Sequence, residues 1–247
     1  MVFSNLRDIS IDISIISHET GGKIQKNKFL MENIPKTDLI STIIKKSIQG
    51  TPLVKIGVRR PKIIITSGIH GNELPPQLAS IKLINNLLNM NLKGTIYIVP
   101  FTIPFATMEN SRRFKGIDIN RAASKNGCIS NTLLKTIKML NIDAVADFHS
   151  TKLRSNPGRQ SVFCSKKPCI KSYKIAQHIS KNTPSELISY GEAGLYYKGA
   201  FEDECNLAGI PAVTCEVVSE NGVIDPGSSE KSYNQMITFL NYFKMIK

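Results

Sequence analysis

The sequence predicts an α/β fold with a central, mostly parallel (mixed) twisted sheet flanked by helices. From residue 61 onward, short apolar runs typical of strands alternate with amphipathic helical segments. Such alternation forms parallel sheets that are covered by helices on both faces. The length of 247 residues, with 41% hydrophobic and 21% charged residues, suits one sizeable globular domain.

Apolar, β-branched runs mark the strands. The first buried strand is predicted at residues 62–67, where three consecutive isoleucines lead towards Gly68. Residues 1–60 are less regular. A β-like segment at 9–16 precedes a helix at 37–47, and we expect this region to form an N-terminal edge of the domain. Further strands are predicted at residues 95–99, 144–148, 160–164, 186–189 and 212–218.

Recurring apolar residues mark the helices. Between Leu74 and Leu88 they recur at spacings of three and four, which gives a helix one apolar face. Pro75 and Pro76 suit the first turn of this helix, where the missing N–H groups cost little. A long polar loop is predicted at residues 101–127. Further helices are predicted at residues 130–140, 170–181, 201–208 and 229–244.

The chain carries 32 basic and 19 acidic residues, a formal net charge of +13. The lysines are scattered rather than clustered, and no recognition motif for nucleic acid is present. We therefore expect no specific nucleic-acid partner. An acidic substrate is compatible with the positive charge.

The cysteines and the apolar runs indicate the compartment. The five cysteines include no C-x-x-C pair, so neither a disulfide framework nor a cysteine zinc site is indicated, and free thiols fit a reducing environment. The apolar runs are too short to span a bilayer, and the first residues do not resemble a secretory signal. We expect a cytoplasmic protein without membrane contact. No feature indicates an oligomeric state.

The motif G-I-H-G-N-E at residues 68–73 directly follows the first buried strand. Its histidine, His70, and its glutamate, Glu73, are both ligands that suit zinc, and glycines around them permit the turn that lets both reach one ion. A single H-x-x-E pair is common, so this motif needs a partner elsewhere in the chain.

The motif D-F-H-S at residues 147–150 ends the third strand of the regular part. His149 would lie at the same edge of the sheet as His70, because the carboxyl ends of parallel strands meet there. Asp147 is two residues away on the same face and could orient a histidine ligand. Two histidines and one carboxylate leave a coordination position open, which is typical of a catalytic zinc.

Two further segments carry polar groups that suit catalysis. The loop from Asn110 to Arg121 contains three arginines and two asparagines, which could bind a carboxylate and stabilise a developing oxyanion, or simply face solvent. Glu216 lies in the apolar strand T-C-E-V-V. Beside a zinc-bound water it could act as general base and then protonate the leaving amine, unless it only faces solvent at the end of the strand.

Taken in order, these motifs resemble the zinc carboxypeptidase clan, and within it the succinylglutamate desuccinylase/aspartoacylase family. The resemblance covers roughly residues 60 to 220. It includes Arg113, which lies seven residues before Asn120 and Arg121 in D-I-N-R. It implies a zinc-carboxypeptidase-like fold and one zinc ion per chain, held by His70, Glu73 and His149.

The resemblance also implies roles for the other motif residues. Arg113 would polarise the scissile carbonyl, Asn120 and Arg121 would hold a substrate carboxylate, and Glu216 would be the general acid/base. Peptidases of this clan also use a mobile tyrosine, for which Tyr190, Tyr196 and Tyr197 are candidates.

We therefore expect residues 1–247 to form a single zinc-hydrolase catalytic domain. Only 31 residues follow Glu216, and they read as a turn and a helix, so we expect no C-terminal β domain and a more open site than in the desuccinylases. A zinc-bound water would attack the amide carbonyl of a small peptide or an N-acyl amino acid with a free carboxylate. Carboxypeptidase-like (metalloprotease) and deacylase-like activities remain open. The alternative is a non-catalytic peptide- or cell-wall-binding module on the same fold.

Overall fold

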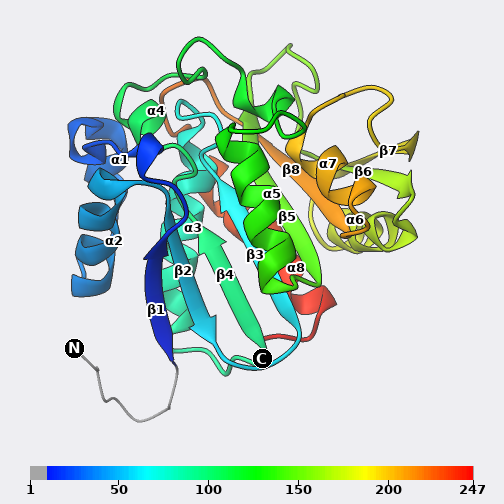
Figure 1. The fold of residues 1–247 in the computed structure, drawn as a ribbon, viewed down its shortest axis with the longest axis horizontal. Helices are drawn as coiled ribbons and strands as arrows, with labels where there is room; N and C mark the ends of the chain where they lie inside the picture. The colour runs from blue at the N-terminus through cyan, green and yellow to red at the C-terminus, as the bar shows by residue number, and fades with distance from the viewer. Residues whose placement is uncertain (1–9, 247) are drawn as a thin grey trace.

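The β-branched runs form the centre of one mixed sheet of eight strands (Figure 1). The computed structural model describes residues 10–246. It confirms the predicted α/β class, with a mixed sheet flanked by helices. The strands are β1 Ile11–Ile15, β2 Pro52–Gly57, β3 Lys62–Ser67, β4 Thr95–Val99, β5 Ala144–Thr151, β6 Ser161–Lys167, β7 Glu186–Glu192 and β8 Ala212–Val218.

The strands follow the order β1-β2-β4-β3-β5-β8-β6-β7 across the sheet. The four central strands, β4, β3, β5 and β8, are parallel to one another. At one edge β1 and β2 run antiparallel. At the other, β6 is antiparallel to β8 and parallel to β7. The parallel centre therefore brings the carboxyl ends of β3, β5 and β8 to one edge, where ligands bind in sheets of this kind.

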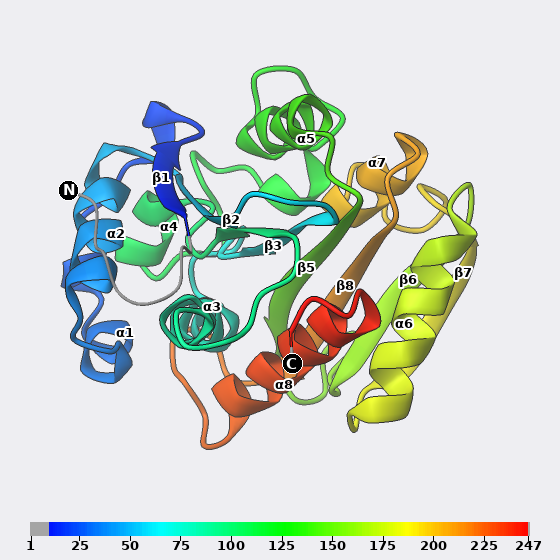
Figure 2. The ribbon, with the colours of Figure 1, turned by 90° about the horizontal axis from the view of Figure 1, so that it is seen from below.

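Helices cover both faces of the sheet (Figure 2). In this view α3, α6 and α8 lie on one side, while α5 and α7 lie on the other. The helices are α1 Lys28–Asn33, α2 Asp38–Gln49, α3 Leu74–Leu87, α4 Pro104–Met108, α5 Ile129–Leu140, α6 Ile170–Asn182, α7 Phe201–Leu207 and α8 Ser228–Tyr242, with short 3₁₀ turns η1 His18–Thr20, η2 Ile24–Lys26 and η3 Ile119–Arg121.

The isoleucines of β3 show how the two faces are filled. Ile63 and Ile65 belong to the core that also includes residues of α3, α6 and α8. Ile64 points the other way, into the core that includes residues of α5 and α7. All three are fully buried. This alternation explains why the central strands are apolar without interruption, because both of their faces are covered.

The strand β2, the helices α1 and α4, and the short 3₁₀ turns were not predicted. The strand β2 was missed, although its Val54 and Ile56 alternate with the less buried Lys55, because only its pairing with β1 and β4 defines it. Helix α4 lies in the segment predicted as a loop, and its five residues are too few to show a helical period. The β-like segment at 9–16 is confirmed as the shorter β1, with residue 9 outside the described part of the chain.

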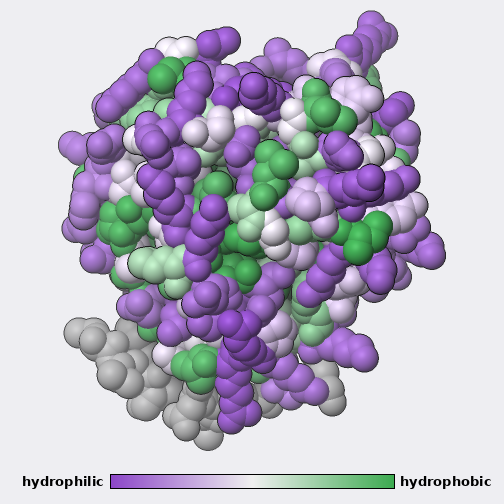
Figure 3. Space-filling model, turned by 45° about the vertical axis from the view of Figure 1, so that its right-hand side comes forward, coloured by the Kyte–Doolittle hydropathy of each residue, from purple (hydrophilic) through white to green (hydrophobic). Residues whose placement is uncertain are grey.

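The surface carries mostly hydrophilic side chains. On the face shown in Figure 3, hydrophobic side chains form only small separate groups. Among the helices of residues 10–246, none is both long and apolar enough to cross a membrane.

Candidate metal centre and active site

The turn after β3 and the end of β5 bring the two motif histidines together. β3 and β5 are parallel neighbours, with Ser67 opposite Phe148. Gly68 leaves β3 with a φ of +72°, a conformation that favours glycine. His70, Glu73 and His149 then lie so that one ligand atom from each is within 4.8 Å of the others. The structure therefore assembles the three residues that the motifs indicated.

Gln77, on the first turns of α3, holds the turn that carries His70 and Glu73. Its side-chain amide nitrogen donates to the backbone carbonyls of His70, Gly71 and Glu73, at 3.4, 3.1 and 2.9 Å. The hydroxyl of Thr107 in turn donates to the Gln77 carbonyl oxygen. This buried network satisfies backbone groups that belong to no strand or helix. No motif in the sequence indicated Gln77.

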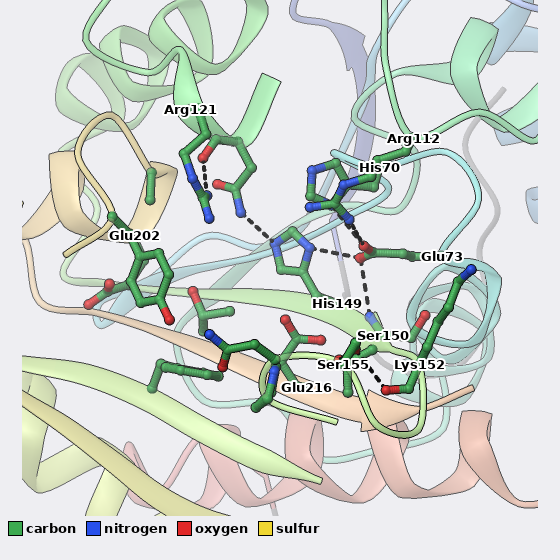
Figure 4. Close-up of a pocket in the computed structure, with 18 of the residues that line it drawn as sticks. His70, Glu73, Arg112, Arg121, His149, Ser150, Lys152, Ser155, Glu202 and Glu216 are labelled. Carbon is green, nitrogen blue, oxygen red and sulfur yellow. Dashed lines mark hydrogen bonds and ion pairs between the residues drawn. The ribbon is translucent and has the colours of Figure 1, made fainter. Parts of the chain in front are cut away.

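Both imidazoles present the same nitrogen to Glu73. The Nδ1 atom of His70 lies 2.8 Å from Oε1 of Glu73, and the Nδ1 atom of His149 lies 2.8 Å from Oε2. The backbone N–H of Ser150 donates to the same Oε2 atom at 3.1 Å. The three side chains are only 2–3% exposed. The Nδ1 atoms and the carboxylate thus converge on one buried point (Figure 4).

A second carboxylate holds the far side of each imidazole. Nε2 of His149 lies 2.7 Å from Oδ2 of Asp147, the contact expected from their spacing on the strand. Nε2 of His70 lies 2.9 Å from Oδ1 of Asp118, whose role the sequence did not reveal. A carboxylate beside Nε2 accepts a hydrogen bond from the N–H group at that position. The lone pair of Nδ1 is then free to bind a metal.

The charges of this cluster favour a bound cation. Burial alone would lower the pKa of His149, but the carboxylates of Asp147 and Glu73 raise it well above its usual range. Burial would raise the pKa of Glu73, yet the neighbouring His70 and His149 hold it below its usual range. In the absence of a metal, protons on the imidazoles balance the buried carboxylates. A divalent ion at Nδ1 would take their place, so the donor set fits zinc.

Glu216 faces the cluster from the neighbouring strand. It lies opposite His149 in the pairing of β5 with β8. Its Oε2 atom is buried and makes no hydrogen bond within residues 10–246. Burial raises the pKa of Glu216 to about 8. A carboxyl group with such a pKa can both accept and donate a proton near neutral pH.

The arginine that reaches the cluster is Arg112, which the motif spacing did not select. Its Nη1 atom donates to Oε1 of Glu73 at 2.9 Å, and its Nη2 atom lies 3.5 Å from Oδ2 of Asp118. Arg113 instead donates to the backbone carbonyl of Gly116 and does not line the pocket. In this structure Arg112, and not Arg113, contacts the cluster, and the role expected for Arg113 stays a prediction.

Asn120 and Arg121 both line the pocket, and their expected role in binding a carboxylate stays a prediction. The side-chain Oδ1 atom of Asn120 accepts a hydrogen bond from the backbone N–H of Phe201 at 3.0 Å, which fixes the Asn120 side chain against α7. Arg121 donates to the backbone carbonyl of Asn120 at 2.6 Å, and its guanidinium lies 5.1 Å above the ring of Tyr197. These contacts leave donors of Arg121 without a carboxylate partner in the described part of the chain.

One pocket of about 330 Å³ is lined by His70, Glu73, Arg112, Asn120, Arg121, His149 and Glu216, among others. Figure 4 shows His149 and Glu73 at its centre, with Arg121 and Glu202 on one side and Lys152 and Ser155 on the other. Of the three tyrosine candidates, Tyr190 and Tyr197 line this pocket, whereas Tyr196 does not and is 68% exposed.

Comparisons with known proteins agree with this architecture. Residues 59–156 match the Succinylglutamate desuccinylase/Aspartoacylase catalytic domain. No curated protein sequence matches the chain.

Solved structures share the fold. A succinylglutamate desuccinylase/aspartoacylase from Rhodobacter sphaeroides is 16% identical, with a TM-score of 0.61 over 82% of this chain and 62% of the other. A succinylglutamate desuccinylase from Silicibacter sp. TM1040 is 18% identical, with a TM-score of 0.65 over 82% and 64%. The product-bound ectoine utilization protein EutE (DoeB) from Ruegeria pomeroyi is 17% identical, with a TM-score of 0.61 over 82% and 64%.

At these identities the likeness establishes the fold. The chain spans about three-fifths of the length of these structures. In sequence over residues 59–156, and in fold over four-fifths of its length, the chain is thus similar to the succinylglutamate desuccinylase/aspartoacylase family of the zinc carboxypeptidase clan, as its motifs predicted.

Proposed function

We propose that the protein is a zinc-dependent hydrolase that cleaves an amide bond next to a substrate carboxylate. The observation that carries the proposal is the convergence of two Nδ1 atoms and one carboxylate beside Glu216, whose buried Oε2 atom has no hydrogen-bond partner within residues 10–246. The similarity to the desuccinylase/aspartoacylase catalytic domain supports the reading as a hydrolase. The substrate would be an N-acyl amino acid or a small peptide with a free carboxylate.

His70, Glu73 and His149 would hold the zinc ion. When bound, zinc would supply a Lewis acid that activates water and polarises the amide carbonyl. Asp118 and Asp147 would keep both imidazoles in the orientation and tautomer that zinc requires.

Glu216 would move the proton of the reaction. Hydrolysis consumes one water, breaks the C–N bond, and yields a carboxylic acid and an amine. Glu216 would take a proton from the attacking water and deliver it to the leaving nitrogen. Its position opposite His149 and its pKa of about 8 support this role.

Three other side chains would bind the substrate. Arg112 would donate to the carbonyl oxygen as negative charge develops on it, the role that the motif spacing assigned to Arg113. Asn120 and Arg121 would hold the carboxylate next to the scissile amide, since Arg121 offers planar paired donors. We also place the enzyme in the cytoplasm, which its five free cysteines support.

Metal content tests the proposal. The wild type, His149→Ala and the control His178→Ala would be purified without added metal and analysed by plasma mass spectrometry. His178 lies on α6, away from the pocket. We expect about one zinc per chain in the wild type and the control, and loss of zinc from His149→Ala. A wild type that stays free of metal after incubation with zinc would refute the proposal.

Hydrolysis is tested separately. N-acyl amino acids and small peptides would be offered to the zinc-loaded wild type, to Glu216→Gln, and to the control Glu220→Gln, which is exposed. We expect turnover in the wild type and the control and its loss in Glu216→Gln. Zinc binding without turnover of any amide would favour the non-catalytic binding module.

A further inference from the structure

Three aromatic side chains form one wall of the pocket, here called the aromatic wall: Phe163 from β6, Tyr190 from β7 and Tyr197 from the loop before α7. The ring centroid of Phe163 lies 6.4 Å from that of Tyr190 and 6.2 Å from that of Tyr197. The hydroxyl of Tyr190 donates to that of Tyr197 at 3.3 Å. The rings thus support one another and form a preformed apolar surface.

The aromatic wall adjoins the proposed binding site for the substrate carboxylate. The guanidinium of Arg121 lies 5.1 Å above the ring of Tyr197. An amino acid whose carboxylate binds Arg121 must place its side chain within a few ångströms of that carboxylate. The aromatic wall is therefore within reach of the side chain of the released amino acid.

The charges at this end of the pocket do not suit an acidic side chain. Two other cations line the pocket. Arg112 is engaged by Glu73 and Asp118, and Lys152 lies on the opposite side of His149 (Figure 4). A second carboxylate beside Arg121 would thus lose its hydration without gaining a cation of its own.

A cationic side chain is disfavoured as well. Glu202 lies at this end and is only 8% exposed, but its carboxyl group already accepts from Asn206. Burial and the nearby Asp203 raise the pKa of Glu202 well above its usual range, which disfavours its charged form. The ring of Tyr197 already makes a cation–π contact with the guanidinium of Arg121. An apolar side chain is the class that this surface accommodates.

We propose that the aromatic wall selects amides of amino acids with an aromatic or large aliphatic side chain over those of aspartate and glutamate. This inference rests on the proposed function, because it takes Arg121 as the site for the substrate carboxylate. It names a preference that differs from that of enzymes acting on succinylglutamate or acylated aspartate.

The first test compares substrates with apolar and with acidic side chains. The zinc-loaded wild type would be given N-acetylmethionine and N-acetylglutamate, whose side chains have similar length, together with N-acetylphenylalanine and N-acetylaspartate. We expect kcat/KM to be at least about tenfold higher for the apolar substrates, the discrimination that an apolar contact typically provides. A preference for the glutamate or aspartate substrate would overturn the inference and leave the hydrolase proposal intact.

Binding of free amino acids gives a readout that does not depend on turnover. Isothermal titration calorimetry of zinc-loaded protein with phenylalanine and with glutamate should show tighter binding of phenylalanine. If phenylalanine binds more tightly but no N-acyl substrate is cleaved, the aromatic wall stands and the hydrolase proposal fails. If glutamate binds as tightly or more tightly, the aromatic wall does not select side chains.

Variants in the loop before α7 provide a matched set. Tyr197→Ala removes part of the aromatic wall and should reduce the preference for phenylalanine over glutamate, while Tyr197→Phe keeps the ring and should retain it. Leu195→Ala, in the same loop but exposed and outside the pocket, should behave as the wild type. An unchanged preference in a folded Tyr197→Ala protein would contradict the inference. A fall in kcat for Tyr197→Phe with the preference intact would mark the hydroxyl as catalytic and leave the ring as the selecting group.

Discussion

Each histidine of the metal cluster lies between two carboxylates, and the outer one decides how well its ring is oriented. Asp147 is fully buried and contacts Nε2 of His149 at 2.7 Å while it accepts a hydrogen bond from Thr66. We expect Asp147→Asn to weaken zinc binding by about 10–100-fold, because an amide orients the imidazole less firmly and stabilises its proton less.

Competition with a chromophoric chelator would measure this zinc affinity. Asp143→Asn provides the matched control, since Asp143 pairs with Arg60 at the other end of β5. An Asp147→Asn protein that binds zinc as tightly as the control would show that the outer carboxylate does not support the ligand.

Arg112 and Arg113 differ by one position in sequence and by their surroundings in the structure. Arg112 contacts Glu73, whereas Arg113 contacts only a backbone carbonyl of its own loop. We expect Arg112→Gln to lower kcat/KM by roughly 100–1,000-fold, since it removes a donor for the developing oxyanion. Arg113→Gln should change it little. A larger loss in Arg113→Gln would return the role to the residue that the motif spacing indicated.

At the scale of elements, the turn between β3 and α3 holds the metal ligands against α4. A Cβ atom on Gly71 would collide with the backbone of Ala106 and Thr107, which cannot move aside as a flexible side chain could. We expect Gly71→Ala to destabilise the fold by about 1–3 kcal/mol and to displace Glu73. Each kcal/mol lowers Tm by roughly 2–4 °C in a chain of this size.

Thermal unfolding and zinc content would both report the change at Gly71. Gly191→Ala is the control, because an added Cβ there meets no atom within 4 Å. If Gly71→Ala matched this control in Tm and bound zinc normally, the close approach of α4 would not constrain the turn.

The central elements could be predicted because local and long-range signals coincide in them. The strands β4 and β8 appear at the predicted residues 95–99 and 212–218, because both consist mainly of apolar and β-branched residues between turns. Strand β5 extends three residues beyond the predicted end, through His149 to Thr151. The pairing of β5 with β8 continues to Val218. The polar residues at the end of β5 hid this extension in the sequence.

The candidate site was predictable where strand ends supply its residues. His70 and His149 follow adjacent parallel strands, so the topology alone brings them to one edge. Arg112 and Asp118 come from an irregular loop without a period, and only its folded path decides which side chain reaches Glu73. The motif spacing consequently selected Arg113, one residue away.

At the scale of the whole molecule, a bound metal would join parts of the chain that are far apart in sequence. The ligands come from the turn before α3 and from β5, and Asp118 adds the long loop between them. Zinc at 100 times its dissociation constant should stabilise the fold by about 2.7 kcal/mol. A strong chelator should therefore lower Tm by about 5–10 °C in a chain of this size.

Calorimetry with and without the chelator would measure this shift. His149→Ala should unfold at the same temperature in both conditions, whereas His178→Ala should respond as the wild type. An equal shift in His149→Ala would show that the chelator acts elsewhere on the molecule.

The reversal of strand direction between β8 and β6 separates two kinds of residue. The proposed metal ligands follow β3 and β5, within residues 59–156, where the chain matches the desuccinylase/aspartoacylase catalytic domain. The aromatic wall comes from β6, β7 and the loop before α7, all beyond that segment. Given the proposed function and selectivity, mutations in this outer part of the sheet would alter which amino acid is accepted without moving the proposed ligands. Substrate range would then diverge between related chains while the proposed reaction is kept.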